Sequence, residues 1–139
     1  MKSPEIRLSF SAIATAQCAA TIFAAVLWWC GAFLGGFGME IAVIGAAESG
    51  VLLVTSLFVL VLFSPAKKRP IATVATLWSA ASFMRFIVAL IASTLLYYVA
   101  QFGLRPMLFS FLLSAVFLLI AETKVLTNSL AECSKTTND

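Results

Sequence analysis

Long apolar runs and short polar breaks alternate along the chain. Four runs are long enough for a transmembrane helix, which needs about 20 mostly apolar residues, and they cover residues 8–34, 39–63, 71–100 and 104–123. The breaks carry helix-interrupting residues: "GGFG" at 35–38, "SPAKKRP" at 64–70 and "QFGLRP" at 101–106. Residues 124–139 predict a short polar C-terminal tail. The pattern therefore predicts an all-α fold, with one domain (1–139) of four transmembrane helices in two antiparallel hairpins.

The composition agrees with a polytopic membrane protein and offers little chemistry for an enzyme. Hydrophobic residues make up 62% of the chain and charged residues 11%, whereas soluble domains are about 45–50% apolar. The chain has no histidine, and we find no glycine-rich phosphate loop, metal-ligand spacing or nucleophile elbow. We therefore expect no enzymatic activity, no cofactor, no metal site and no nucleic-acid partner.

The first apolar run raises two questions: whether it is a signal peptide or a retained helix, and whether its cysteines form a disulfide. The apolar run at 8–34 is longer than the apolar region of a signal peptide, about 7–15 residues, so we expect a retained helix. Cys18 and Cys30 lie on this same run, about 18 Å apart along a helix, which is beyond disulfide reach. With Cys133 in the polar tail, all three cysteines are expected to be free thiols.

The distribution of cations predicts the orientation. If all four runs span, one side holds seven cations: Lys2, Arg7, Lys67, Lys68, Arg69, Lys124 and Lys135. The other side holds only Arg105. Because cytoplasmic loops are enriched in Lys and Arg, both termini are expected in the cytoplasm. Aromatic residues near the outer helix ends fit an interfacial belt: Trp28, Trp29, Phe33, Tyr97 and Tyr98. Trp78 lies deeper and is expected to pack.

One cation interrupts the third run. Arg85 has no other charge within fifteen residues on either side, and a charge near the bilayer centre costs about 2.5–3.5 kcal/mol on insertion scales. Glu48 is the only other ionisable group expected at depth, since Glu122 is placed at the inner end of its helix, close to water. Counted from the cytoplasmic side, Glu48 lies at about 24 Å and Arg85 at about 21 Å. The sequence predicts an intramembrane Glu48–Arg85 ion pair.

Small residues beside these charges predict close helix packing. They are Gly45, Ser49 and Gly50 on the second helix, and Ala81, Ser82 and Ala89 on the third. Gln17 and Thr21 could add hydrogen bonds from the first helix. Two interpretations of the pair stay open: an ion pair that fixes helix register, or a site that contacts an ion path or a partner's carboxylate.

Three stretches carry a resemblance to a known family: "AVIGAAESGVLLV" at 42–54, "FMRFIVALIASTLL" at 83–96 and "LLSAVFLLIAETKVL" at 112–126. With four helices and a basic central loop, the chain resembles the ATP synthase protein I family, accessory membrane proteins of bacterial F-type ATP synthases. The resemblance implies a location in the bacterial inner membrane and a role in assembling or stabilising the ring of c subunits. Arg85 is the residue that it would carry over, as a transient partner for the mid-membrane carboxylate of a c subunit.

Two other functions stay open beside this one. The chain could be a small ion channel or transporter, for a divalent cation among others and with a homo-oligomer as one form, in which Glu48 and Arg85 line the path. It could also be a purely structural subunit of a larger membrane complex.

Overall fold

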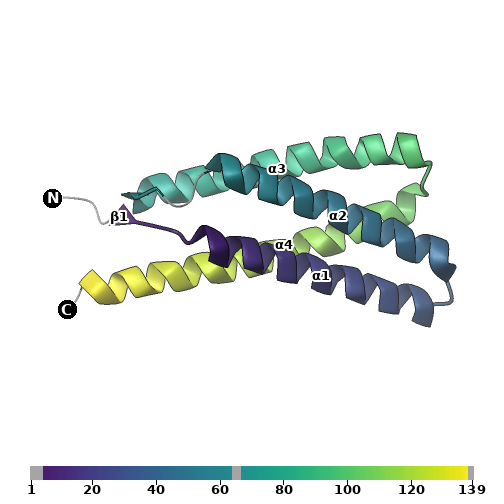
Figure 1. The fold of residues 1–139 in the computed structure, drawn as a ribbon, viewed down its shortest axis with the longest axis horizontal. Helices are drawn as coiled ribbons and strands as arrows, with labels where there is room; N and C mark the ends of the chain where they lie inside the picture. The colour runs from purple at the N-terminus through teal and green to yellow at the C-terminus, as the bar shows by residue number, and fades with distance from the viewer. Residues whose placement is uncertain (1–4, 64–66, 138–139) are drawn as a thin grey trace.

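The computed structural model describes residues 5–63 and 67–137, and within them it has four long helices. They are α1 (Phe10–Leu34), α2 (Gly38–Phe63), α3 (Ile71–Ala100) and α4 (Leu104–Thr137). The helix bounds predicted from the sequence agree for the first three helices to within two residues. Figure 1 shows the four helices running side by side along the long axis of the molecule. The all-α prediction is confirmed.

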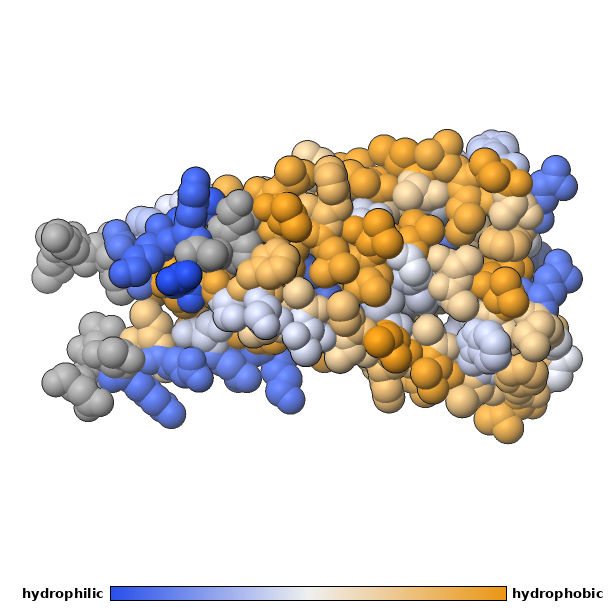
Figure 2. Space-filling view, in the orientation of Figure 1, coloured by the Kyte–Doolittle hydropathy of each residue, from blue (hydrophilic) through white to orange (hydrophobic). Residues whose placement is uncertain are grey.

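Each of the four helices is long and apolar enough to cross a membrane. Figure 2 shows why this fits a bilayer: hydrophilic residues gather at the two ends of the bundle, and the surface between them is mostly hydrophobic. Many large apolar side chains point outward, among them Phe58, Phe83 and Phe109, which are 58%, 70% and 66% exposed. A soluble protein rarely exposes such a large apolar surface, so the chain is a multi-pass membrane protein.

The helices do not contribute equally to the core. α1 packs against α2 and α4, and α2 also packs against α4, so these three form the centre of the bundle. α3 packs mainly against α2, as expected for neighbours joined by a short loop. The described part of α3 buries only Val74, Arg85 and Ala89. The second predicted hairpin is therefore a loose one, because α3 lies against α2 more than against α4.

The described ends of the chain lie together at one end of the bundle (Figure 1), which we call the termini end. Here β1 (Glu5–Ile6) pairs antiparallel with β2 (Arg69–Pro70), with Glu5 opposite Pro70. Arg69 also donates a hydrogen bond of 3.1 Å to the carbonyl of Phe63, the last residue of α2. The opposite end holds the turns at 35–37 and 101–103, and we call it the turn end.

The predicted polar tail is instead helical. α4 continues from Leu104 to Thr137, about 51 Å at 1.5 Å per residue, so its last turns extend beyond a hydrocarbon core of about 30 Å. One face of this extension packs on the apolar cluster at the termini end, through Val125, Leu126, Leu130 and Cys133. Their spacing follows the helical period, and this contact explains why the helix does not stop at Thr123.

Two of the tryptophans pack inside the bundle. Trp78 stacks edge-on against Phe63, with ring centroids 5.6 Å apart, as predicted. Trp28, which is predicted to lie in an interfacial belt, donates a hydrogen bond of 2.8 Å from its indole nitrogen to the carbonyl of Ile41. Its ring fills the space beside Gly45, where a Cβ atom would lie 1.9 Å from the indole. Trp28 therefore joins α1 to α2.

The core is built in layers that repeat every three or four residues along each helix. Nearest the termini end is an apolar layer, made up of Ile13, Leu60, Ala81 and Leu126. Next comes the Arg85 layer, which contains Gln17, Ser56, Arg85 and Glu122. An apolar Leu52 layer follows, with Ala20, Leu52, Ala89 and Leu118. Toward the turn end lies the Glu48 layer, with Glu48, Ser49, Ser93 and Ser114. Two polar layers thus alternate with two apolar ones.

Candidate functional site: two buried carboxyl groups

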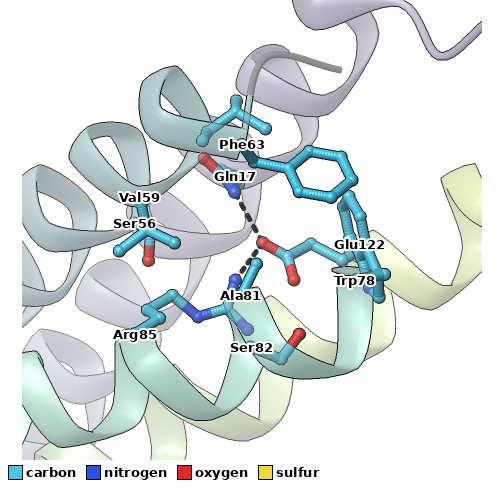
Figure 3. A pocket seen from close by; sticks show the side chains of 10 residues that line it. Gln17, Ser56, Val59, Phe63, Trp78, Ala81, Ser82, Arg85 and Glu122 are labelled. Carbon is cyan, nitrogen blue, oxygen red and sulfur yellow. Dashed lines mark hydrogen bonds and ion pairs between the residues drawn. The ribbon is translucent and has the colours of Figure 1, made fainter. Parts of the chain in front are cut away.

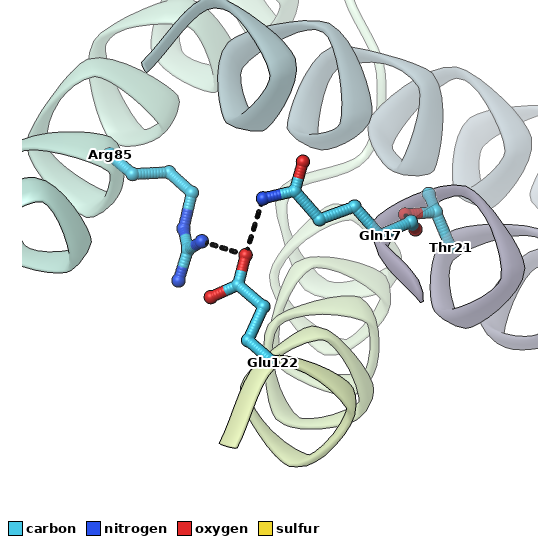
Figure 4. A network of polar contacts seen from close by, with 4 residues as sticks. All are labelled: Gln17, Thr21, Arg85 and Glu122. Carbon is cyan, nitrogen blue, oxygen red and sulfur yellow. Dashed lines mark hydrogen bonds and ion pairs between the residues drawn. The ribbon is translucent and has the colours of Figure 1, made fainter. Parts of the chain in front are cut away.

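Glu122 is the centre of the Arg85 layer. Its Oε1 atom accepts a hydrogen bond of 2.6 Å from the Gln17 side-chain amide and an ion-paired hydrogen bond from Arg85 Nη1. Figure 4 shows the three side chains converging from α1, α3 and α4 on one carboxylate oxygen. Thr21, one turn along α1, donates a hydrogen bond of 2.6 Å to the backbone carbonyl of Gln17, which satisfies the buried hydroxyl within its own helix. The layer therefore ties three helices to one buried charge pair.

A small cavity lies beside this network. Its volume is about 20 Å³, and Gln17, Ser56, Ser82, Arg85 and Glu122 are among the residues that line it (Figure 3). Several buried polar atoms around it have no hydrogen-bond partner among the described residues: Gln17 Oε1, Ser56 Oγ, Arg85 Nε and Nη2, and Glu122 Oε2. This volume holds about one water molecule. The cavity can complete the polar network but has no room for a larger ligand.

Apolar residues close the Arg85 layer on both sides. Leu52 and Leu118, one turn away toward the turn end, are fully buried. Leu60 and Phe63 cover the face of the Arg85 layer that is turned toward the termini end, and they also line the cavity. Because Arg85 and Glu122 are only 4% and 1% exposed, the pair is sealed inside the protein. This is the geometry of a structural ion pair that fixes how the helices pack.

The predicted Glu48–Arg85 pair is therefore wrong. Arg85 pairs with Glu122, and Glu48 belongs to a different layer, two helical turns away along α2 from Ser56. Glu122 was expected near water because its helix was thought to end at Thr123. Since α4 continues to Thr137, Glu122 lies in the middle of a helix and is 1% exposed.

The small residues predicted to line the contact of α2 with α3 take other roles. Gly45 and Ser49 face α1 and α4: Gly45 lies under Trp28, and Ser49 shares a hydrogen bond of 2.9 Å with Ser114. Gly50 is exposed, with open space around it. Only the residues on α3 lie where they were expected, beside Arg85 and in the core: Ala81, Ser82 and Ala89.

Glu48 is fully buried but has a different environment. Ser93 of α3 donates a hydrogen bond to its Oε1 atom, and its Oε2 atom has no partner among the described residues. In the described part of the chain no Lys or Arg forms an ion pair with it. An isolated buried carboxylate is costly unless a proton or a cation compensates it. Glu48 is therefore compensated either by a proton or by a cation from outside the described residues.

Glu48 also lines a cavity large enough for a ligand. The cavity has a volume of about 250 Å³ and is lined by Glu48 of α2 and by residues of α3 and α4 from their halves nearer the turn end. Its other walls are mostly apolar and aromatic, with Leu90, Tyr97, Tyr98, Leu104, Met107, Leu108 and Phe111. Two aliphatic hydroxyl residues, Ser93 and Thr94, complete the lining. A buried carboxyl group in an apolar cavity is the arrangement expected of a small-molecule or ion site.

The donor set does not match a divalent metal ion. Among the described residues, no three His, Cys, Asp or Glu side chains lie close enough to hold a metal, and Ca²⁺ or Mg²⁺ takes six or more oxygen ligands. Ser93 donates to Glu48 and Thr94 to the carbonyl of Leu90 with a distance of 2.7 Å, and Tyr97 and Tyr98 add two phenolic hydroxyls to the lining. The lining offers a divalent ion one carboxyl group and no second anionic ligand.

Comparisons with known proteins add no constraint on this site. No protein-family model, curated protein or solved structure matches the chain.

Proposed function

We propose that the chain is a small membrane transporter that binds a cation at Glu48 and exchanges it for a proton. The observation that carries the proposal is the Glu48 carboxyl group itself, fully buried, without a basic partner in the described residues and placed in the wall of a cavity of about 250 Å³. Intramembrane carboxyl groups of this kind occur in ion and proton pathways. A proton and a cation compete for the same oxygen atoms, which couples the two.

The surroundings of Arg85, unlike those of Glu48, support a structural role for this residue. Its Nη1 atom is engaged by Glu122, it lies in a layer closed by apolar residues, and its cavity has room for about one water. An arginine in this state cannot also line a path beside Glu48. We therefore place ligand binding at Glu48 alone and assign the Arg85 layer to holding α1, α3 and α4 together.

We also infer that the termini end faces the cytoplasm. The termini end of the described chain carries six cations, Arg7, Lys67, Lys68, Arg69, Lys124 and Lys135, and the turn end carries Arg105. Reporter domains fused after Asp139 should give a cytoplasmic signal, and reporters inserted at Gly36 or Gly103 should give an outside signal. A cytoplasmic signal from Gly36 would contradict this orientation.

Proton release tests the cation site. The purified protein, in weakly buffered detergent, is titrated with sodium, potassium and alkylammonium chlorides while a pH-sensitive dye is followed. Binding at Glu48 should release up to one proton per chain, and Glu48→Gln should abolish the release. Glu40→Gln is the matched control, because Glu40 lies in the first turn of the same helix and is exposed. Release that survives in Glu48→Gln, or no release with any cation, would overturn the proposal.

An accessory role at the ATP synthase c-ring is the second proposal. The observation that favours it is the outward face of α3, where Phe83, Ile91 and Leu95 are at least half exposed and could pack against a partner's helix. Because Arg85 is turned inward, this face would bind by apolar packing. Cysteines at Ile91 or Leu95 should then crosslink to a c subunit, and ring yield should fall without the protein. An unchanged yield and no crosslink would exclude the role.

A further inference from the structure

We propose that the Glu48 cavity binds a small hydrophobic organic ammonium ion, which reaches it sideways from the lipid between α3 and α4. This inference rests on the proposed cation site and adds the chemical class of the ligand and its route. Three features of the cavity carry it: one uncompensated carboxyl group, aromatic walls, and a mouth formed by exposed side chains.

The charge selects for a cation with few other polar groups. Glu48 Oε2 has no partner in the described residues, so one positive charge would be satisfied there by an ion-paired contact. A divalent metal ion would need several more oxygen ligands, and the lining has no second carboxyl group. A quaternary ammonium group has no N–H donors to satisfy and needs only one anion, because its remaining surface is alkyl.

The walls select for a hydrophobic body. Leu90, Met107 and Phe111 line the cavity, and Phe111 and Met107 are buried. Tyr97 adds an aromatic wall that is locked edge-on against Tyr98, with ring centroids 5.3 Å apart. Aromatic faces attract alkylammonium groups through cation–π contacts. The volume of about 250 Å³ is below the range of about 300–1,000 Å³ for drug-sized ligands, so the ligand is small.

The mouth of the cavity lies on the lipid-facing surface. Four lining residues are about half exposed or more: Leu90, Tyr98, Leu104 and Leu108. In a bilayer this rim extends from Leu90 and Leu108, in the apolar parts of α3 and α4, to Tyr98 and Leu104 near the turn end. A hydrophobic cation partitions into the membrane before it binds, whereas a hydrated inorganic ion has no favourable path through such a rim.

The test uses a pair of ligands of the same shape and different charge. Benzyltrimethylammonium and its neutral isostere neopentylbenzene are measured by equilibrium dialysis against the full-length protein in nanodiscs. The wild type should bind the cation and bind the isostere at least about 30-fold more weakly, because a buried charge loses its partner. Glu48→Gln should remove this preference, and Glu40→Gln should keep it. Equal binding of the two ligands, or a preference that survives in Glu48→Gln, would overturn the inference.

Two further variants test whether the cavity walls contribute to binding independently of the stability of the fold. Tyr97→Leu should weaken cation binding about 5- to 30-fold and leave the isostere unchanged. Leu108→Trp, at an exposed position of the rim, should lower the binding of both ligands and leave the thermal transition unchanged. A Tyr97→Leu variant that binds the cation as wild type would contradict the aromatic wall.

The outcomes distinguish the two proposals. If sodium or potassium releases a proton through Glu48 and benzyltrimethylammonium does not bind, the cation site stands and the organic ligand is wrong. If no cation binds at Glu48, both proposals are wrong.

Discussion

Glu122 and Glu48 are both buried glutamates in the middle of the same helix bundle, yet their surroundings differ in every respect that matters for function. Glu122 has a basic partner, an amide donor and apolar residues on both sides. Glu48 has one hydroxyl donor and an open cavity. Burial alone does not separate the two, since Glu48 is 0% and Glu122 1% exposed. What separates a structural charge from a candidate binding charge is whether the protein itself supplies the counter-charge.

The largest expected effect compares the two carboxyl groups directly. Glu122→Gln removes the charge that balances Arg85, and a buried ion pair that loses one partner costs about 3–5 kcal/mol. Glu48→Gln leaves no opposite charge behind, so we expect a loss below about 1 kcal/mol. The free energy of unfolding in mixed micelles measures both. Equal losses at the two positions would show that Glu48 is structural as well.

Double-mutant cycles compare the coupling of Arg85 to Glu122 with its coupling to Glu48. Arg85→Met and Glu122→Gln should be strongly non-additive, with a coupling energy of about 1–3 kcal/mol, because they share one contact. Arg85→Met and Glu48→Gln should be additive to within about 0.5 kcal/mol, since they have no shared partner. The same unfolding assay measures both cycles. A large coupling in the second cycle would restore the pairing that the sequence predicted.

The next largest effect on stability is expected where Gly45 of α2 packs against Trp28 of α1, on the side of α2 away from the cavity. An added Cβ at Gly45 would lie 1.9 Å from the Trp28 ring, and overpacking costs about 1–3 kcal/mol. Gly45→Ala should therefore destabilise the protein, although it should not affect ligand binding at the α3–α4 side. Gly50→Ala is the matched control, with nothing within 4 Å of its Cβ on the same helix. It should leave stability unchanged or improve it.

The smallest expected effect concerns the hydroxyl pair next to Glu48. Ser49 and Ser114 share a hydrogen bond of 2.9 Å, and such bonds between membrane helices contribute about 0.6 kcal/mol. Ser114→Ala should lower the free energy of unfolding by this amount and leave cation binding intact. A loss of binding in Ser114→Ala would mean that this hydroxyl pair positions Glu48.

The fold could be predicted from the sequence because apolar runs of this length have one stable use, a membrane helix. The partner of Arg85 could not be predicted by counting residues from the ends of the helices. The sequence predicts Glu122 at the inner end of its helix, close to water, because the residues after Thr123 are largely polar. However, four residues of this segment continue the helical period and pack on the core: Val125, Leu126, Leu130 and Cys133. Applied to the tail, the same periodicity would have indicated that Glu122 lies in mid-helix.

The layers could also have been found in the sequence, but their pairing could not. Polar residues recur four positions from apolar ones in three helices, as in the series 48, 52, 56 on α2, 85, 89, 93 on α3 and 114, 118, 122 on α4. Each series alternates polar and apolar positions. Which polar position of one helix meets which of another depends on axial offsets between helices, and these come from the loops and the β1–β2 pair.

The uneven attachment of α3 has a mechanical consequence. In its first half the helix is fixed by β2, by the Trp78–Phe63 contact and by the Arg85–Glu122 pair. Beyond Ala89, the only hydrogen bond of α3 to another helix in the described residues is that of Ser93 to Glu48. α3 is therefore fixed by side-chain contacts mainly in its first half, while its second half forms one wall of the cavity and is tied to the bundle by the Ser93–Glu48 hydrogen bond and by the short loop to α4. The carboxyl group that we propose as the cation site thus also helps to hold the wall of its own cavity.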